Sequence, residues 1–204
     1  MARVKLSRGF YGRDTLLVAR DLLGKILIVD TKAGRTACRL VETEAYQGDD
    51  PASHSCRGET SRTKVMFGHP GVAYVYFIYG MYEMLNFVTE RKGYPGAVLI
   101  RAGEPLEGEE LMIRRRSKAA HLTNGPGKLC RAMGVELSHN GAALSGPNLM
   151  VVDDGFRPKR VSVSPRVGIT AGKEKFWRFF ITDNPHVSRA PQNKLARNSR
   201  GNAS

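Results

Sequence analysis

The segment AYVYFIYGMYEMLN, residues 73–86, decides the fold of this chain and carries its most unusual side chains. Residues 73–78 are mainly β-branched or aromatic, Tyr79-Gly80 can form a turn, and residues 81–89 run back, so the segment predicts a β-hairpin. Tyr79 then lies at the exposed tip. A large ring at a tip adds nothing to the core, which favours its insertion into another molecule, such as the base stack of a DNA duplex. The alternative is a hairpin that packs its own tyrosines together.

The charge of the chain narrows the class of partner. The 204 residues carry a net charge of +13, spread from Arg3 to Arg200. Such a field attracts phosphate polyanions, but it does not distinguish DNA, RNA and an anionic membrane. No run of about eighteen apolar residues predicts a membrane span, and MARVKLSRGFYG lacks the apolar stretch of a signal peptide. We therefore expect a soluble intracellular protein that uses no membrane, in the cytoplasm or nucleoid if the source is bacterial.

The cysteines argue against structural cross-links. Cys38, Cys56 and Cys130 form no CxxC pair, which disfavours both a disulfide framework and a zinc site. His54 and Cys56 lie close together in the sequence, but no second pair with ligand spacing follows. We expect reduced thiols, no metal and no cofactor.

Several helices and strands are predicted by local patterns. Asp14 is expected to cap a helix, LLVARDLL at residues 16–23, which ends at Gly24. Residues 25–30 and 36–46 predict a second hairpin around Lys32-Ala33-Gly34. Further elements are expected as strands at 97–102, 149–152, 161–163 and 176–182, and as helices at 106–118 and from Gly125-Pro126 through Met133.

The remaining segments set the domain organisation. Residues 47–72 are rich in Gly, Asp, Ser, Arg and Pro without a sustained period, which predicts a long loop of the functional or mobile kind. Residues 189–204 are polar and basic and predict a disordered tail. Short strands and a few helices, without βαβ alternation, predict an α+β fold in a single domain over residues 1–188.

Acidic groups concentrate in VETEAY, residues 41–46. Strand alternation places Glu42, Glu44 and Tyr46 on one face. A solvated strand face is the common fate of such glutamates. A catalytic role is favoured by the neighbouring aromatic ring and by the polar loop with His54 that follows. The residues alone leave both possibilities open.

The segments ARDLLGK, VETEAY, YVYFIYGMYEMLN, VLIRAGEPLEG, NGPGKLC and SPRVGI, with His54 after the second, resemble the consecutive motifs of the alkyladenine DNA glycosylase family, also called methylpurine or 3-methyladenine DNA glycosylases. They occur in the family's order between residues 14 and 188. The resemblance implies one mixed domain with a curved antiparallel sheet, flanking helices and a protruding hairpin. It also implies a monomer that acts on double-stranded DNA containing damaged purines.

The resemblance implies two catalytic residues. Glu44 matches the carboxylate that holds and deprotonates the water attacking C1′ of the damaged nucleotide, and Arg101 matches the arginine that positions this water and carboxylate. A nearby carboxylate also stabilises an oxocarbenium-like transition state. Glu42 is the rival carboxylate, which would orient its neighbours or be solvated. No lysine is placed as a Schiff-base nucleophile, so the expected product is an uncut abasic site.

The resemblance also implies a base pocket and an inserted residue. Tyr46, His54 and Tyr76 match two aromatic faces and an imidazole that close on the extruded purine, and Asn86 matches an asparagine that crowds the exocyclic group of normal guanine. Tyr79 matches the residue inserted into the duplex. A purine alkylated at N3 or N7 is positively charged, so it leaves without a general acid. Its cation–π attraction to tyrosine is worth roughly 0.5 to 2 kcal/mol, and a weakly paired lesion is less costly to flip.

Four basic residues are candidate phosphate ligands. Lys128 follows Gly125-Pro126-Gly127 at a predicted helix start, where backbone N–H groups are free. Arg57, Arg62 and Lys64 lie in the long loop. The alternative for all four is ordinary solvated charge.

The expected function is that of a monofunctional base-excision-repair DNA glycosylase for alkylated purines: 3-methyladenine first, with 7-methylguanine and hypoxanthine as further candidates. One alternative is a noncatalytic nucleic-acid-binding module, which leaves the acidic face of residues 41–46 unexplained. Another is a hydrolase of a nucleoside or small glycoside, which needs neither the charge of +13 nor an exposed Tyr79. Tyr74 and Tyr82 are expected to have structural roles.

Overall fold

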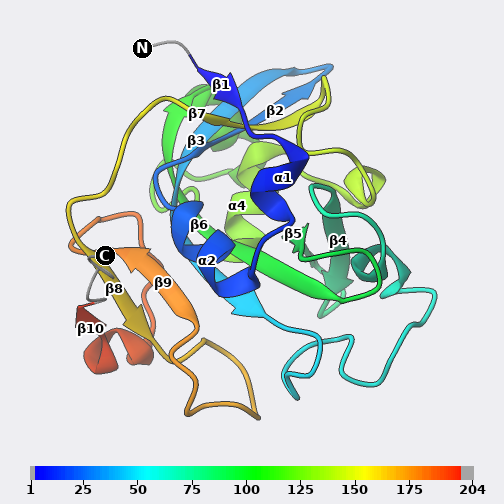
Figure 1. Cartoon of the computed structure of the whole chain (residues 1–204). Coiled ribbons are helices and arrows are strands. Elements are labelled where there is room, and N and C mark those ends of the chain that lie inside the picture. Colours follow the sequence, from blue (N-terminus) through cyan, green and yellow to red (C-terminus); the bar gives the residue numbers. More distant parts are fainter. Residues whose placement is uncertain (1–2, 199–204) are drawn as a thin grey trace.

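The structure is a computed structural model that describes residues 3–198 (Figure 1). Within this range ten strands, all paired antiparallel, form one sheet against which the helices pack, which confirms the predicted α+β fold. The strands are β1 (Val4–Lys5), β2 (Ile26–Thr31), β3 (Gly34–Tyr46), β4 (Ala73–Ile78), β5 (Tyr82–Thr89), β6 (Gly96–Glu107), β7 (Leu149–Asp153), β8 (Val161–Ser164), β9 (Arg178–Ile181) and β10 (Arg197–Asn198). The helices are α1 (Arg8–Tyr11), α2 (Thr15–Asp21), α3 (Glu109–Arg116) and α4 (Pro126–Met133), with 3-10 turns η1 (Lys64–Phe67), η2 (Leu137–His139) and η3 (Pro191–Leu195).

Strand β3 organises the sheet. It pairs with β6 along one edge, and along the other edge first with β2 and then with β9. The strand order is β1-β7-β2-β3-β6-β5-β4, and β8 and β10 continue outward from β9. The predicted hairpin of residues 25–46 is confirmed, because Thr31 pairs with Gly34 around a two-residue turn. The second half of β3, which holds the acidic segment, is therefore flanked by strands on both edges.

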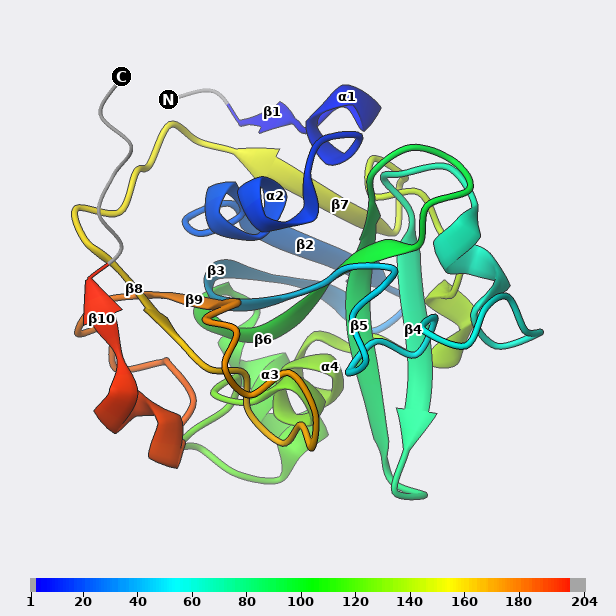
Figure 2. The ribbon, with the colours of Figure 1, turned by 60° about the horizontal axis from the view of Figure 1, so that its bottom comes forward.

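Helices cover both faces of the sheet, as Figure 2 shows, with α2 on one side and α3 and α4 on the other. The carboxylate of Asp14 accepts hydrogen bonds from the backbone N–H groups of Leu16 and Leu17, which confirms the predicted cap. Thr43 on β3 donates its hydroxyl hydrogen to the carbonyl of Ala19 at 2.8 Å, which ties α2 to the sheet. The helix that begins at Pro126 is also confirmed, and its buried face includes Leu129.

The boundary between β6 and α3 differs from the prediction. Residues 106 and 107 belong to β6, because this strand pairs with β3 as far as Ala37 and Glu107. The helix starts only after Gly108, whose φ of +75° is left-handed and where a Cβ atom would collide with the carbonyl oxygen of Arg35. Pairing along the full edge of β3 outweighs the local pattern that predicted a helix from residue 106.

The tyrosine hairpin forms as predicted from β4 and β5, joined by residues 79–81. Its tip points away from the body of the sheet in Figure 2. The tyrosines do not pack as one cluster: Tyr74 is 2% exposed, whereas Tyr79 is 76% exposed. The ring of Tyr82 packs on Gly127 of α4, where a side chain would have no room. Tyr74 and Tyr82 therefore hold the hairpin to the protein, and Tyr79 is free at the tip.

The C-terminal tail is more ordered than predicted. Within residues 189–198, η3 forms, and β10 pairs with the edge of β8. Asn193 donates a hydrogen bond from its side chain to the carbonyl of Ser188 at 3.1 Å, and the guanidinium of Arg197 lies 4.6 Å from the ring centre of Phe176. The prediction of disorder missed these tertiary contacts, because composition does not reveal an open strand edge. For residues 199–204 the prediction lies outside the described range.

The long loop folds against the protein through turns and η1. Asp50, Ser53, Ser55 and Thr63 are buried in it. Among the described residues no helix is long and apolar enough to cross a membrane.

Candidate active site

Most of the predicted site residues line one cavity of about 470 Å³. It lies between the tyrosine hairpin, the long loop, β6 and residues 167–170. Seven residues were assigned to catalysis, base binding or insertion, and six of them line this cavity: Tyr46, His54, Tyr76, Tyr79, Asn86 and Arg101. The seventh, Glu44, lies directly behind its wall. The structure thus brings together residues from four separate segments.

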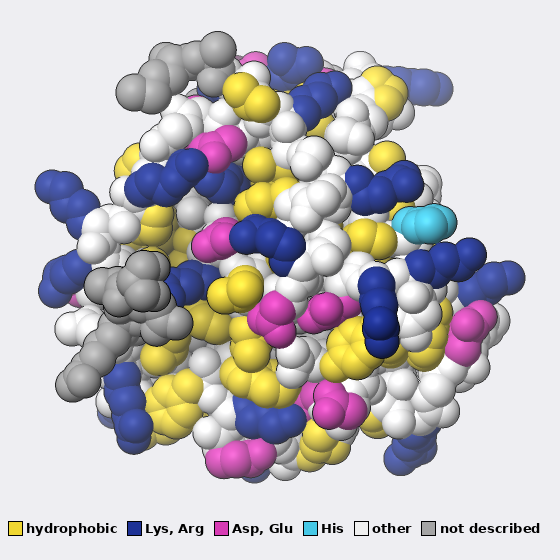
Figure 3. Space-filling view, in the orientation of Figure 1, with side chains coloured by type: hydrophobic (Ala, Val, Ile, Leu, Met, Phe, Trp, Pro, Cys, Tyr) yellow, Lys and Arg dark blue, Asp and Glu magenta, His cyan; other side chains and the backbone are white. Residues whose placement is uncertain are grey.

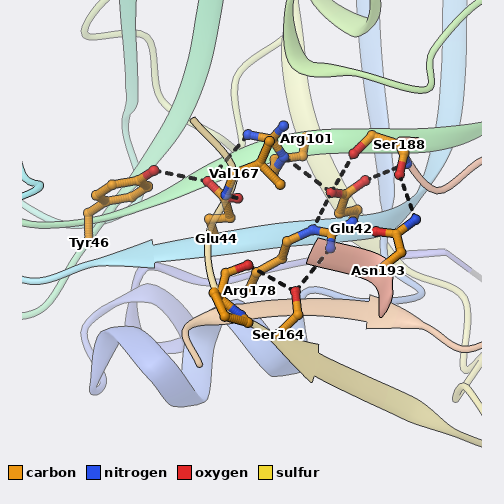
Figure 4. A network of polar contacts seen from close by, with 10 residues as sticks. Glu42, Glu44, Tyr46, Arg101, Ser164, Val167, Arg178, Ser188 and Asn193 are labelled. Atoms are coloured by element: carbon orange, nitrogen blue, oxygen red, sulfur yellow. Dashed lines mark hydrogen bonds and ion pairs between the residues drawn. The ribbon is translucent and has the colours of Figure 1, made fainter. Parts of the chain in front are cut away.

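Glu44 is fully buried and held by three donors (Figure 4). Its Oε2 accepts hydrogen bonds from the Tyr46 hydroxyl at 2.9 Å and from Nη1 of Arg101 at 3.3 Å. Its Oε1 accepts the backbone N–H of Val167 at 2.8 Å. All three donors line the cavity. The carboxylate is therefore screened from the cavity by a layer one residue thick.

Arg101 reaches the carboxylates because of a bulge in the sheet. Glu42 pairs with Ala102 and Thr43 with Ile100, so Arg101 is the extra residue on β6. Bulges re-aim side chains in this way. Arg101 is 7% exposed, and its guanidinium donates from Nε to Glu42 at 3.1 Å as well as to Glu44. One arginine thus bridges both carboxylates.

Neither Glu42 nor Glu44 is exposed to solvent, so the alternative prediction of a solvated strand face is wrong for both glutamates. Glu42 is fully buried, and Arg178 donates to its Oε1 at 2.7 Å. Ser188 donates twice to Glu42, from its backbone N–H and its hydroxyl, each at 2.7 Å. Figure 4 shows Glu42 and Ser188 on the side of Arg101 away from Tyr46, with the side chain of Arg178 reaching Glu42 from below. Glu42 lies outside the cavity lining, so its contacts suit a positioning role through Arg101.

Three rings from two segments form one aromatic wall of the cavity. The centroids of His54 and Tyr76 lie 4.5 Å apart with nearly perpendicular planes, and those of Tyr74 and Tyr76 lie 5.4 Å apart. Nδ1 of His54 lies 3.3 Å from the hydroxyl of Tyr74. Burial, followed by the positive charge of Arg62, lowers the pKa of His54, which favours a neutral imidazole. Tyr74 therefore serves the pocket as well as the core, a double role that the sequence did not indicate.

Two further residues shape the pocket. Tyr46 also lines the cavity, and burial together with the nearby Glu44 raises its pKa well above the ordinary value, so its hydroxyl keeps the proton that it donates. Asn86 is 5% exposed, and its side-chain amide donates to the carbonyl of Tyr74 at 3.2 Å. This bond holds the amide against the hairpin at the edge of the cavity.

A buried ion pair behind Tyr46 was missed. Asp50 and Arg166 are both fully buried and paired with each other, and Arg166 also donates to the carbonyl of Ala45 at 2.9 Å. The guanidinium carbon of Arg166 lies 4.6 Å from the ring centre of Tyr46. Arg166 lies in the SPRVGI segment, but the sequence gave no sign that it meets an aspartate of the long loop.

The four candidate phosphate ligands lie outside the cavity lining. Arg57, Arg62 and Lys64 are exposed on the long loop. Lys128 donates to Oδ1 of Asn124 at 3.0 Å, and burial, followed by neighbouring basic residues such as Arg116, lowers its pKa. On the face in Figure 3, lysines and arginines are spread among acidic side chains. Within residues 3–198 no group of three or more His, Cys, Asp or Glu side chains is placed to hold a metal ion.

Comparisons with known proteins identify the family of the chain. The family model described as methylpurine-DNA glycosylase matches residues 9–185. Three relatives, each provisionally named 3-methyladenine DNA glycosylase, cover most of the chain. The protein of Methanocella arvoryzae is 53% identical over 194 residues, which are 91% of this chain and 97% of the relative. That of Desulfitobacterium hafniense is 45% identical over 90% of this chain and 98% of its own, and that of Alkaliphilus oremlandii is 46% identical over 91% of this chain and 100% of its own. The chain therefore belongs to the methylpurine-DNA glycosylase family of enzymes.

Proposed function

We propose that this DNA glycosylase flips alkylated purines out of double-stranded DNA and hydrolyses their N-glycosidic bonds, acting as a monomer. 3-Methyladenine is the first expected base, and 7-methylguanine and hypoxanthine are further candidates. The abasic strand remains uncut, because none of the lysines within residues 3–198 lines the cavity to form a Schiff base. One observation supports the proposal above the others: a fully buried Glu44 is held by three groups that all line an aromatic cavity.

Glu44 is the proposed general base. A carboxylate near C1′ deprotonates the attacking water and stabilises the positive charge of an oxocarbenium-like transition state. Glu44 has no exposed surface in the free protein. Water therefore reaches it only when Arg101, Tyr46 or Val167 gives way as DNA binds, and we propose that the bond to Arg101 loosens, since it is the longest of the three at 3.3 Å. Arg101 remains held by Glu42 and can then hold the water.

The pocket selects the base by charge and shape. A purine methylated at N3 or N7 carries a positive charge in the nucleotide, so it is a good leaving group and is attracted to the faces of Tyr46 and Tyr76. The neutral state favoured for His54 adds no opposing charge. Asn86 is placed to crowd the exocyclic group of guanine.

Tyr79 is the proposed wedge. Its side chain is 76% exposed at the tip of the hairpin and also borders the cavity, so one ring can fill the gap in the duplex while the flipped base enters beside it. Insertion of an apolar side chain offsets part of the cost of unstacking. Arg57, Arg62, Lys64 and Lys128 are the proposed phosphate ligands.

The proposal is tested with alkylated DNA and Glu44→Gln. The unmodified protein, incubated with methylated DNA without magnesium, should release free base and leave heat-labile abasic sites. Glu44→Gln should bind lesion DNA normally and release base at least about a hundredfold more slowly, because a general base contributes roughly 10² to 10⁴ in rate. Glu104→Gln is the matched control, since Glu104 is a half-buried glutamate on β6 outside the cavity.

Each outcome decides between the candidates. Substantial base release by Glu44→Gln removes Glu44 from the role of base. Binding of lesion DNA without any base release by the unmodified protein supports the noncatalytic module. Release from free nucleosides but not from DNA, with a weak dependence on salt, supports the small-glycoside hydrolase.

A further inference from the structure

Arg62 is not part of the cavity lining, but it contacts Tyr76, one of the aromatic rings that form it. Its guanidinium carbon lies 4.9 Å from the ring centre of Tyr76, within the range of a cation–π contact. The residue is exposed, and no carboxylate within residues 3–198 forms an ion pair with it. The ring of Tyr76 is therefore one contact that holds this guanidinium in place.

The charge of Arg62 acts on the cavity itself. Tyr76 lines the cavity and contacts His54 and Tyr74, which line it too. Arg62 contributes to the lowered pKa of His54, after the larger effect of burial. A base bound between these rings therefore lies within reach of a fixed positive charge.

A guanidinium and an alkylated purine use a tyrosine ring in the same way. Both are flat and positively charged, and both are attracted to the negative face of the ring. A neutral purine such as hypoxanthine gains little from this attraction and is not repelled by a cation. The contact between Arg62 and Tyr76 therefore acts differently on charged and neutral bases.

We propose that Arg62 is a specificity-determining residue, whose guanidinium competes with a positively charged purine for Tyr76 and so reduces the preference of the pocket for charged over neutral bases. This inference rests on the proposed function. A DNA phosphate attracts the same guanidinium, because Arg62 is exposed and has no carboxylate partner in the described part of the chain.

Arg62→Gln tests the proposal, with Arg57→Gln as the matched control. Both arginines are exposed on the same loop, but only Arg62 contacts a ring of the pocket. The measurement is the single-turnover rate of release of 7-methylguanine, which is charged in DNA, and of hypoxanthine, which is neutral. In Arg62→Gln the ratio of the first rate to the second should rise about two- to fivefold.

The control separates charge at the ring from contact with phosphate. If both arginines bind phosphate, each variant should reduce the slope of log affinity for DNA against log salt concentration by about 1. This reduction should be equal for DNA with either lesion. The ratio of rates should stay unchanged in Arg57→Gln. An unchanged ratio in Arg62→Gln, or an equal rise in both variants, overturns the proposal.

Nucleoside binding tests the same point without DNA or catalysis. Arg62→Gln should bind 7-methylguanosine about two- to fivefold more tightly than the unmodified protein does, and should bind inosine equally well. Equal changes for both nucleosides overturn the proposal. If the unmodified protein releases no base from methylated DNA, the proposed function fails, and the nucleoside titration alone then decides whether Arg62 discriminates by charge.

Discussion

Glu42 and Glu44 lie two residues apart on β3, but their losses should have different consequences. Glu42 is the only carboxylate of the described chain that pairs with the buried Arg178, so Glu42→Gln leaves a buried cation without a partner. We expect a loss of about 3 to 5 kcal/mol in the free energy of unfolding. Glu44→Gln should lose only about 1 to 3 kcal/mol, because Arg101 keeps its pairing with Glu42.

Urea unfolding of both variants measures this difference, with Arg178→Lys as a control that keeps the charge but not the geometry. Equal losses in Glu42→Gln and Glu44→Gln would contradict the assignment of Glu42 to positioning. So would a Glu42→Gln variant with unchanged stability and no base release, since that pattern belongs to a catalytic group.

For individual residues, the sequence predicted which side chains share a face of the strand, but not which groups bind them. Strand alternation placed Glu42, Glu44 and Tyr46 together, as found. It could not reveal that Arg101 is a bulge residue, because a bulge depends on the register between two strands whose nearest ends, Tyr46 and Gly96, are 50 residues apart in sequence. The donor Val167 was equally hidden, since a backbone N–H has no sequence signature.

The backbone of the tyrosine hairpin is strained at Tyr79, the residue proposed to enter the duplex. Tyr79 has a φ of +55°, a left-handed conformation that is costly for a residue with a Cβ atom, and glycine adopts it freely. Tyr79→Gly should therefore leave the free energy of unfolding unchanged or raise it by up to about 1 kcal/mol. The same variant should bind lesion DNA more weakly, because it has no ring to fill the gap left by the flipped nucleotide.

Thermal unfolding and titration with lesion DNA measure the two effects, and Tyr79→Phe is the control that keeps the ring. Tyr79→Phe should retain lesion affinity. If Tyr79→Gly keeps both its stability and its affinity for lesion and undamaged DNA, the wedge assignment is wrong.

Elements with local signals were predicted, and elements that depend on distant partners were not. The hairpins at residues 25–46 and 73–89 have turn residues and alternating strands within one short segment, and both form. The extension of β6 to Glu107 and the pairing of β10 with β8 depend on strands far away in the sequence. The local pattern predicted a helix from residue 106, and composition predicted disorder after residue 188. Neither signal contains information about the strand edges of β3 and β8 with which these segments pair.

The cavity as a whole depends on a buried contact between segments that are far apart in sequence. Asp50 belongs to the long loop, whose residues 51–54 line the cavity, and Arg166 precedes Val167, the donor to Glu44. Their ion pair also lies against the ring of Tyr46. This one ion pair thus connects the long loop, the ring of Tyr46 and the segment that contains Val167, the donor to Glu44. The sequence could not predict it, because both residues lie in irregular segments without a period.

Asp50→Asn should therefore destabilise the protein by about 3 to 5 kcal/mol, because it leaves Arg166 buried without its counter-charge. Arg166→Gln should lower the free energy of unfolding by less, since Lys175 lies 3.6 Å from Asp50 and can take over part of the pairing.

A double-mutant cycle by urea unfolding should give a coupling energy of about 0.5 to 3 kcal/mol between Asp50 and Arg166. Arg160→Gln is the control, because its pair with Asp183 is exposed and should contribute less than about 1 kcal/mol. Strictly additive losses at Asp50 and Arg166 would mean that the pair does not act as a unit, and the loop and the residues around Val167 would then be held independently.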